Sequence, residues 1–314
     1  MSVGMEKAVS LINSGELVAF PTETVYGLGA DAWNPSAVKK IFELKQRPAD
    51  NPLIVHIASL DMVEQFAGGM PGEAELLMQR FWPGPLTLIF KKKEEVLDLV
   101  TAGLDTVALR WPNNPISQEL IFRAGPLVAP SANRSGRPSP TRAEHVKDDF
   151  GEDFPVIDGG STQIGLESTV LDISDKPFVI RRPGAISCEE IEACIGAPVD
   201  KKTTSELNET AKSPGTKYSH YTPDAEVRWM DPDEAPDHSG TLYLLHSRNT
   251  ETESENIIQF NGDYQQMARE LYDRFRQADR AGYEAVAVEN FTSEQLKQEK
   301  MAPALHNRIS KAIG

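Results

Sequence analysis

The residues best suited to chemistry gather in short polar segments that lie beside apolar runs or predicted helix ends. Residues 20–32 (FPTETVYGLGADA) end such a run with hydroxyl and acidic side chains and two glycines. Residues 45–56 (KQRPADNPLIVH) join two cations to a Pro-rich loop, and residues 129–139 (APSANRSGRPS) concentrate hydroxyl, amide and guanidinium donors. Side-chain donors and backbone N–H groups in such turns suit an anionic substrate. Taken singly, each segment is also consistent with an ordinary tight turn.

Further polar strand ends come later in the sequence. Residues 165–170 (GLESTV) and 181–184 (RRPG) carry polar groups, as do Thr106 and Arg110 around the run VALR. So many polar strand ends in one domain are harder to explain as surface turns alone. In open α/β sheets, the loops that follow the strands form the ligand site. We therefore expect these segments to meet at one binding site.

Several common types of catalytic site are missing from the sequence. Ser131 lies outside a G-x-S-x-G motif and no His and Asp complete a triad, which argues against a covalent serine mechanism. No phosphate-binding P-loop motif occurs, and the histidines lack metal-ligand spacing, which argues against a protein-ligated catalytic metal. Gly27, Gly29 and Ala32 match G-x-G-x-x-A, but the expected helix begins only at Pro35, so a dinucleotide fingerprint is disfavoured.

Apolar runs alternate with amphipathic stretches up to about residue 196, which predicts an α/β domain. The expected strands are residues 17–20, 53–57, 86–90, 107–110, 127–129, 170–173 and 178–180. The expected helices are residues 35–45, 60–67, 72–81, 115–124, 141–150 and 187–195. A second, smaller α/β domain is predicted from strands at 227–230, 242–245 and 285–288 and helices at 267–278 and 302–313. The predicted boundaries are a domain over 1–200, a linker over 201–225 and a domain over 226–314.

Composition agrees with two unequal globular domains. The chain has 314 residues, of which 39% are hydrophobic and 25% charged. Neither secretion nor membrane spanning is expected, because residues 1–16 have no unbroken apolar core and no run of about 18 apolar residues occurs. Cys188 and Cys194 suit neither a disulfide framework nor a zinc site, which points to reduced thiols in a cytosolic protein.

The net charge of −15 argues against a general affinity for nucleic acid. Any polyanion site must therefore be local. Cations stand beside turn residues, whereas most acidic residues fall on predicted helices. These cations are Lys45, Arg47, Arg110, Arg134, Arg137, Arg142, Arg181 and Arg182. The pattern predicts a basic pocket in an acidic body.

Together, the segments PTETVYGLGAD, KQRPADNPLIVHI, FWPGPLTLI, APSANRSGRPSP, STVLDI and RRPG resemble the YrdC family in order and spacing. The later segment SPGTKYSHYTP, followed by a small α/β domain, is similar to the two-domain threonylcarbamoyl-AMP synthases of that family. The resemblance implies a twisted, mixed, open sheet with a basic cavity, a smaller Rossmann-like domain, and a linker that covers the cavity.

The resemblance also implies an activity, namely a nucleotidyl transfer that makes threonylcarbamoyl-adenylate and pyrophosphate from L-threonine, bicarbonate or CO2, and ATP. This is the first step of threonylcarbamoyladenosine formation in tRNAs that read codons starting with A. The implied catalytic residues are Lys45, Arg47, Ser131 and Asn133. The implied L-threonine site is Thr24, His56, Arg110, Ala129 and Ser168. The implied ATP site is Arg47, Asn51, Thr106, Ser131, Ser139, Arg182 and Tyr221.

Mg²⁺ is expected to be bound by the phosphates of ATP. Neither a metal held by the protein nor an organic cofactor is expected. The implied partner is the transferase complex that receives the product, with at most a weak contact to tRNA. Tyr221 on the linker is expected to close over the substrates as a lid. Two alternatives remain open: an RNA-binding module, against which the net charge counts, and carbamoyl transfer from carbamoyl phosphate.

Overall fold

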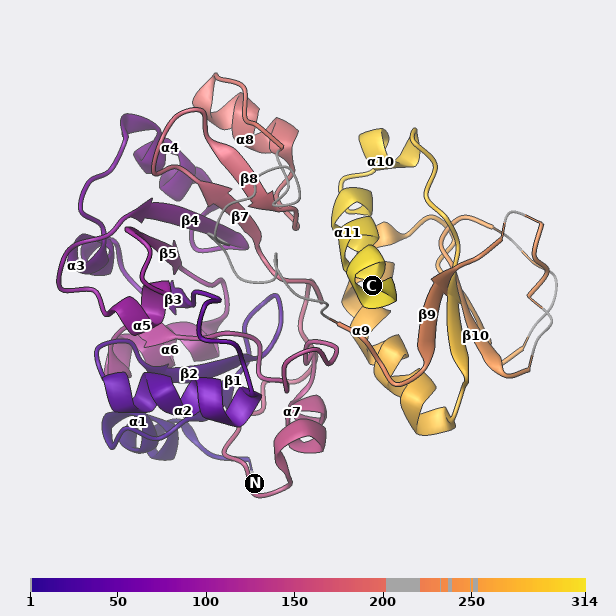
Figure 1. The fold of residues 1–314 in the computed structure, drawn as a ribbon, viewed down its shortest axis with the longest axis horizontal. Helices are drawn as coiled ribbons and strands as arrows, with labels where there is room; N and C mark the ends of the chain where they lie inside the picture. Colours follow the sequence, from indigo (N-terminus) through magenta and orange to yellow (C-terminus); the bar gives the residue numbers. More distant parts are fainter. Residues whose placement is uncertain (1, 202–220, 232, 237–238, 249, 251–253) are drawn as a thin grey trace.

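A mixed sheet and a parallel sheet form the cores of two α/β domains in the computed structural model (Figure 1). The structure describes residues 2–201, 221–231, 233–236, 239–248, 250 and 254–314. The N-terminal domain is the larger, and the chain ends on a helix between the two sheets. Most of the predicted linker, including Lys217, Tyr218 and His220, lies outside the described residues, so the predicted boundaries stay a prediction.

The larger sheet has eight strands in the order β1-β2-β6-β3-β5-β4-β7-β8. The strands are β1 (Val18–Phe20), β2 (Gly27–Asp31), β3 (Ile54–His56), β4 (Leu86–Lys91), β5 (Thr106–Arg110), β6 (Leu127–Val128), β7 (Thr169–Asp172) and β8 (Val179–Arg182). The pairs β3·β5 and β4·β7 are parallel and the other neighbouring pairs are antiparallel. The mixed open sheet expected from the sequence is confirmed.

Helices cover this sheet and agree closely with the sequence pattern. They are α1 (Met5–Asn13), α2 (Pro35–Lys45), the 3₁₀ turn η1 (Leu60–Met62), α3 (Val63–Phe66), α4 (Gly72–Phe81), α5 (Asp98–Thr101), α6 (Pro115–Ala124), α7 (Ala143–Phe150) and α8 (Cys188–Ile195). Asn34 caps α2 through bonds from Ser36 N and Ala37 N, and Ser187 forms a capping box with Glu190. Helix α1 and the short α5 were not predicted.

Strand β2 is a correction to the expected polar turn at Gly27 and Gly29. Glycine weakens a strand because it lacks a side chain to pack, so the sequence favoured a turn. Here the absent side chain is what permits the strand. A Cβ on Gly29 would lie 2.8 Å from Phe20 Cε1, and one on Gly27 would lie 3.2 Å from Ala129 Cβ. Since Gly27–Asp31 is extended, the dinucleotide fingerprint is excluded.

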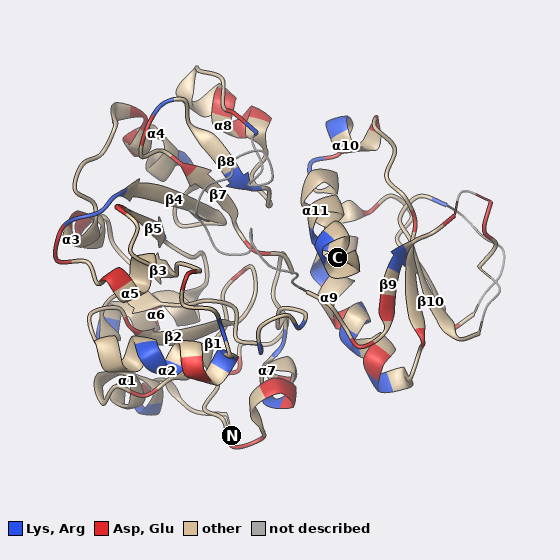
Figure 2. Ribbon diagram, in the orientation of Figure 1, with Lys and Arg blue, Asp and Glu red and all other residues tan. Residues whose placement is uncertain are grey.

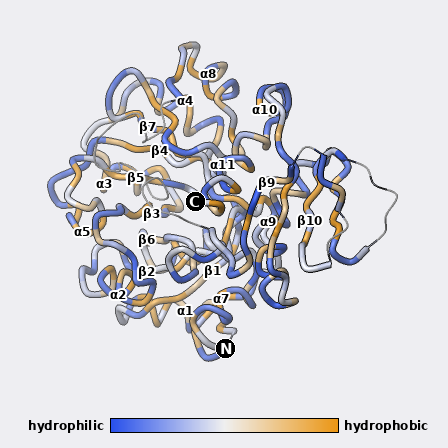
Figure 3. The backbone as a smooth tube through the Cα atoms, turned by 45° about the vertical axis from the view of Figure 1, so that its right-hand side comes forward, coloured by the Kyte–Doolittle hydropathy of each residue, from blue (hydrophilic) through white to orange (hydrophobic). Residues whose placement is uncertain are grey.

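The smaller domain has a parallel sheet in the order β11-β10-β12-β9. Its elements are β9 (Glu226–Trp229), β10 (Thr241–Leu245), β11 (Ile257–Gln259), α9 (Tyr264–Ala281), β12 (Ala285–Val288), α10 (Gln295–Gln298) and α11 (Ala302–Ile313). The expected smaller α/β domain is confirmed, whereas β11 and α10 were not predicted. Hydrophobic and hydrophilic stretches alternate along the chain, as elements with one buried face require (Figure 3).

The helices α9 and α11 lie between the two sheets and join the domains (Figure 1). One hydrophobic cluster spans the junction, because Val25 and Leu166 of the larger domain pack with Leu271 and Leu305 of the smaller one. Buried ion pairs add to it, including Arg276 with Asp149 at 2.6 Å. Figure 2 shows Lys and Arg positions on β8 of the larger domain and on α11 of the smaller one.

Among the described residues, no helix is both long and apolar enough to cross a membrane.

Candidate functional site

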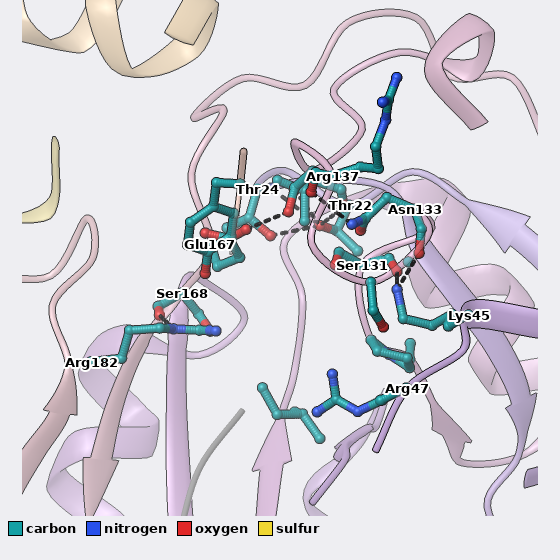
Figure 4. A pocket seen from close by; sticks show the side chains of 18 of the residues that line it. Thr22, Thr24, Lys45, Arg47, Ser131, Asn133, Arg137, Glu167, Ser168 and Arg182 are labelled. Atoms are coloured by element: carbon teal, nitrogen blue, oxygen red, sulfur yellow. Dashed lines mark hydrogen bonds between the residues drawn. The ribbon is translucent and has the colours of Figure 1, made fainter. Parts of the chain in front are cut away.

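A pocket of about 750 Å³, open solvent included, opens in the larger domain. Its walls come from the turn after β1, the end of α2, the ends of β3 and β5, the loop after β6, the segment before β7 and the end of β8. The polar segments singled out in the sequence therefore meet at one place. Lys45 lies beside Ser131 and Asn133 on one side, and Arg182 lies beside Ser168 on the other (Figure 4).

Nearly all of the site residues predicted from the sequence line this pocket. Those in the lining are Thr24, Lys45, Arg47, His56, Arg110, Ala129, Ser131, Asn133, Ser139, Ser168, Arg182 and Tyr221. Asn51 and Thr106 are buried but lie outside the lining. Asn51 is next to it, because its carbonyl accepts a bond from Arg47, whereas Thr106 begins the strand that Arg110 ends. The roles of all these residues stay predictions.

Arg110 is fixed from three directions in the pocket wall. Its Nη1 donates to Thr24 Oγ1 at 2.8 Å, its Nε donates to the Gly84 carbonyl at 3.3 Å, and its Nη2 lies 2.7 Å from Glu23 Oε1. Thr22 orders the same turn by donating from its hydroxyl to the Val25 carbonyl. A rigid guanidinium of this kind suits a carboxylate, which it can bind through two parallel bonds.

His56 ends β3 and is buried beside Arg110. Burial and, second, the positive charge of Arg110 lower the pKa of His56 to about 3. Its imidazole is therefore neutral at pH 7. The ring meets Phe20 edge to face, with 6.5 Å between the ring centroids. Its Nδ1 faces the Ile54 carbonyl at 3.4 Å, which accepts, so a neutral imidazole leaves Nε2 as an acceptor for a polar ligand without adding charge.

Lys45, the last residue of α2, is buried and holds the loop after β6. Its Nζ donates to the Ser131 carbonyl at 2.6 Å and to the Asn133 carbonyl at 2.5 Å. Burial, followed by the charge of Arg47, lowers the pKa of Lys45 well below its ordinary value. Asn133 in turn donates to the Arg134 and Arg137 carbonyls. Lys45, which the sequence placed at a helix end, therefore supports the loop of residues 129–139 that carries the polar donors.

Two arginines complete the cationic lining. Arg47 donates from Nε to the Asn51 carbonyl and from Nη2 to the Pro52 carbonyl. Burial lowers its pKa to about 10, so it stays charged at neutral pH. Arg182 donates from Nε and Nη2 to the backbone and hydroxyl oxygens of Ser168. Arg47 and Arg182 therefore present fixed positive charge to an anion in the pocket.

Comparison with known proteins identifies the family. Residues 10–184 match the Sua5/YciO/YrdC family described as "Telomere recombination", and residues 186–314 match the family "Threonylcarbamoyl-AMP synthase, C-terminal domain". The chain belongs to the Sua5/YrdC family. Threonylcarbamoyl-AMP synthases of Pyrococcus abyssi and Bacillus subtilis are both 44% identical over 98% of this chain, which spans 93% and 92% of their lengths.

A solved structure within the Sua5/YrdC family is similar over both domains. The structure of Pyrococcus abyssi Sua5 complexed with L-threonine superposes with a TM-score of 0.87 at 41% identity, covering 99% of this chain and 94% of that one. The likeness extends across the junction between the domains, so the two-domain architecture is shared by both proteins.

Glu167 lines the pocket but was not among the site residues predicted from the sequence. It accepts bonds from Ser139 Oγ at 2.6 Å, Tyr272 OH at 3.1 Å and Arg308 Nε at 2.8 Å. Burial alone would raise its pKa, but the charges of Arg308 and Arg182 outweigh this and lower it to about 2. Its position directly before Ser168 was the only signal, because both arginine and tyrosine partners are distant in the sequence.

Of the eight cations expected to form a basic pocket, five line it and three do not. Lys45, Arg47, Arg110, Arg137 and Arg182 line the pocket, and Glu167 is the carboxylate among its described lining residues. The remaining cations bond outside the pocket. Arg134 donates to the Asp149 carbonyl, Arg142 pairs with Asp273, and Arg181 pairs with Asp172. These three support α7, the domain junction and β7, respectively.

Within the described part of the chain, no group of three or more His, Cys, Asp or Glu side chains could hold a metal ion. Glu167 is committed to Ser139, Tyr272 and Arg308, so its oxygens are already occupied. The lining instead offers cations and hydroxyls, which fit the phosphates of a nucleotide.

Proposed function

We propose that this chain makes L-threonylcarbamoyl-AMP and pyrophosphate from L-threonine, bicarbonate or CO2, and ATP. The observation that best supports this proposal is that one pocket contains two groups of residues suited to anions. One group is the fixed guanidinium of Arg110 beside the neutral His56. The other consists of the cations Lys45, Arg47 and Arg182. The first suits an amino-acid carboxylate and the second suits a triphosphate. The named activity of the full-length relatives supports this assignment.

The amino-acid half of the pocket positions the nucleophile. Arg110 binds the carboxylate of L-threonine, and Thr24, His56, Ala129 and Ser168 surround the rest of the amino acid. The neutral threonine nitrogen attacks CO2 and loses a proton to water, which gives a carbamate. A carbamate oxygen then attacks the α-phosphorus of ATP, and the bond from that phosphorus to the bridging oxygen breaks as pyrophosphate leaves.

The phosphate half of the pocket stabilises the charge that moves during this transfer. Arg47 and Arg182 neutralise the leaving pyrophosphate, while Lys45 holds the loop that presents Ser131 and Asn133. Asn51, Thr106, Ser139 and Tyr221 complete the ATP site. Alignment and charge neutralisation suffice for such a step, so neither a covalent nucleophile nor a catalytic triad is required.

Mg²⁺ accompanies ATP in this proposal and is held by the phosphates and water. When bound, it neutralises part of the phosphate charge. The pocket residues support a metal that is held by ATP and not by the protein, because the lining is cationic and Glu167 is already bonded to three side chains. No organic cofactor has a role in the reaction.

The product is a mixed anhydride that water destroys, so it must pass quickly to an enzyme that transfers the threonylcarbamoyl group to tRNA. We place this exchange in the cytoplasm, where the free thiols Cys188 and Cys194 remain reduced. The net charge of −15 limits any direct contact with tRNA to a weak one.

Pyrophosphate release tests the proposal. The chain is incubated with ATP, Mg²⁺ and bicarbonate, with and without L-threonine, and with L-serine as a control. We expect release to depend strongly on L-threonine and to require bicarbonate. Equal release without L-threonine would overturn the proposal, and activity with carbamoyl phosphate or salt-sensitive RNA binding would then identify one of the alternatives.

A further inference from the structure

Three buried side chains link the second domain to the pocket. Tyr272 on α9 and Arg308 on α11 are fully buried, and both bond to Glu167 of the first domain. We propose that Tyr272 and Arg308 are positioning residues for ATP, which act by holding Glu167, Ser139 and Tyr221 in place. The inference rests on the proposed function, and it gives the second domain a direct part in forming the nucleotide site.

Arg308 acts on the pocket through its bond to Glu167. Arg308 donates from Nε to the Glu167 carboxylate at 2.8 Å and from Nη1 to the Pro183 carbonyl at 3.0 Å. The other carboxylate oxygen of Glu167 accepts from Ser139 Oγ at 2.6 Å. A fixed carboxylate therefore orients a hydroxyl that faces the pocket. Pro183 follows Arg182, so the same guanidinium also supports the backbone beside a second pocket cation.

Charge explains why an arginine is needed at this place. A carboxylate in the wall of a triphosphate site repels the ligand unless a cation neutralises it. Arg308 supplies that cation from outside the pocket lining, and its side chain has no exposed surface. With Arg308 in place, Glu167 stays ionised and acts as a hydrogen-bond acceptor for Ser139 and Tyr272.

Tyr221 is held by the same two residues. Its ring stacks on Tyr272 with 5.2 Å between centroids, and the Arg308 guanidinium lies 5.7 Å from its centre. Tyr221 is buried and has a φ of 71°, a backbone conformation that costs a non-glycine residue energy. Such a conformation persists only where the surroundings fix it. Thr222 N adds an anchor by donating to the Gly136 carbonyl at 2.8 Å.

This arrangement predicts an effect on ATP and little effect on L-threonine. Tyr272 and Arg308 contact Tyr221 directly and hold Ser139 through Glu167. Arg308 also bonds to the Pro183 carbonyl, next to Arg182. Arg110, in contrast, is fixed by Thr24, Gly84 and Glu23. A residue that only joined the two domains would instead lower the amount of folded protein, and with it the apparent turnover, without changing either Michaelis constant. The split between the two Michaelis constants therefore separates a positioning role from a structural one.

The test compares the full chain with Arg308→Met, Arg308→Lys and Tyr272→Phe. We expect Arg308→Met to raise the KM for ATP by about tenfold or more and to leave the KM for L-threonine within about twofold. Arg308→Lys should recover part of the loss because it keeps the charge. Tyr272→Phe keeps the ring stack and loses only the hydroxyl, so a smaller rise of about threefold to tenfold is expected.

Arg280→Met is the matched control, because Arg280 pairs with Asp148 across the same junction with both side chains well exposed. It should leave both Michaelis constants unchanged. Calorimetric binding of a non-hydrolysable ATP analogue gives a readout that does not need turnover, and thermal melting shows whether each variant folds. If Arg308→Met fails to fold, Tyr272→Phe carries the test.

The outcomes separate the two proposals. If the unmodified chain lacks threonine-dependent pyrophosphate release, the proposed function fails, and analogue binding still tests the positioning role. If the unmodified chain is active but folded Arg308→Met and Tyr272→Phe bind ATP normally, the inference is overturned. Equal weakening of both substrates in these variants would also overturn it.

Discussion

The guanidinium of Arg110 lies 2.7 Å from the carboxylate of Glu23, and both side chains are almost completely buried. The pair is close, yet Arg110 Nη2 and both Glu23 oxygens lack a well-aligned hydrogen bond within the described residues. The contact is therefore mainly one of charge. Removing one member of a buried pair leaves the other charge uncompensated, which costs about 3–5 kcal/mol.

This pairing allows stability and substrate binding to be separated by a double-mutant cycle. We expect Arg110→Met and Glu23→Gln each to lower the free energy of unfolding by about 3–5 kcal/mol, because each leaves a buried charge. The double variant should recover much of that loss, since neither charge remains. L-Threonine binding should be lost in both variants that lack Arg110, while ATP binding is retained.

Urea unfolding measures the stability of the four proteins, and calorimetry measures their binding of L-threonine and of an ATP analogue. Additive losses of stability in the double variant would show that the two charges are not coupled. Retained L-threonine binding in Arg110→Met, or equal loss of both ligands, would mean that Arg110 is assigned to the wrong half of the pocket.

His56 gives a pH dependence whose direction follows from burial. Its pKa is lowered to about 3, whereas an unfolded chain has a histidine pKa near its ordinary value of about 6.5. Between these values the unfolded state binds a proton that the folded state does not. Stability from this group is therefore fully present above pH 6.5 and is lost as the pH falls toward 3, by up to about 1.4 kcal/mol per pH unit.

The comparison of the unmodified chain with His56→Gln isolates this contribution from the other buried histidines. Urea unfolding between pH 5 and 7.5 should show a shallower rise of stability with pH in the variant. The slope is the informative quantity, because a buried glutamine changes the absolute stability as well. Identical slopes in the two proteins would show that His56 has the same pKa in the folded and unfolded states.

Most of the predicted site residues line one pocket, and the sequence signals that pointed to them were local. Cap residues set the starts of α2 and α8, and the apolar runs marked most of the buried strands. Polar residues at the strand ends come together because the strands share one sheet, as for His56 at the end of β3 and Arg110 at the end of β5, which are paired in register. These features depend on neighbours within a few residues along the chain.

The features that could not be predicted from the sequence depend on contacts between segments that are distant along the chain. Gly29 forms a strand because Phe20 of the neighbouring strand occupies the space of its missing side chain, and no local pattern reveals this. Glu167 is important because Arg308, which is 141 residues away, neutralises it. Periodicity and spacing describe which residues share a face, but they do not show which domain face meets another.

Lys45 is expected to support the loop after β6 more than it supports helix α2. Lys45→Met leaves the Ser131 and Asn133 carbonyls without their donor in a buried place, which costs about 2–5 kcal/mol for the two groups together. Displacement of the loop should also raise the KM for ATP. Lys45→Arg is not expected to restore function, because the buried site holds a single compact ammonium.

Lys40→Met provides the control for Lys45, since Lys40 is on the same helix and pairs with Glu16 at the surface. That change should cost less than about 1 kcal/mol and leave the KM for ATP unchanged. Urea unfolding and pyrophosphate release measure both quantities. A Lys45→Met variant as stable as Lys40→Met, with normal ATP kinetics, would rule out the supporting role.

Gly165 brings the loop that carries Glu167 and Ser168 directly against helix α9. Its φ is 83°, and a Cβ there would lie 2.3 Å from the Ala268 carbonyl oxygen and 2.4 Å from Arg269 Cα. Gly165→Ala therefore adds a backbone clash to an unfavourable φ. We expect it to lower the free energy of unfolding by about 2–5 kcal/mol and to raise the Michaelis constants of both substrates, because Gly165 N also bonds to the Thr24 carbonyl.

Gly196→Ala separates these two causes, because Gly196 has a φ of 67° and open space where a Cβ would lie. It should cost only about 1–2 kcal/mol and leave catalysis unchanged. Urea unfolding and pyrophosphate release are measured on both variants. Equal losses of stability, with normal catalysis in each, would mean that the loop can move away from α9 without disturbing Glu167, and that close contact between the domains is not needed for the site.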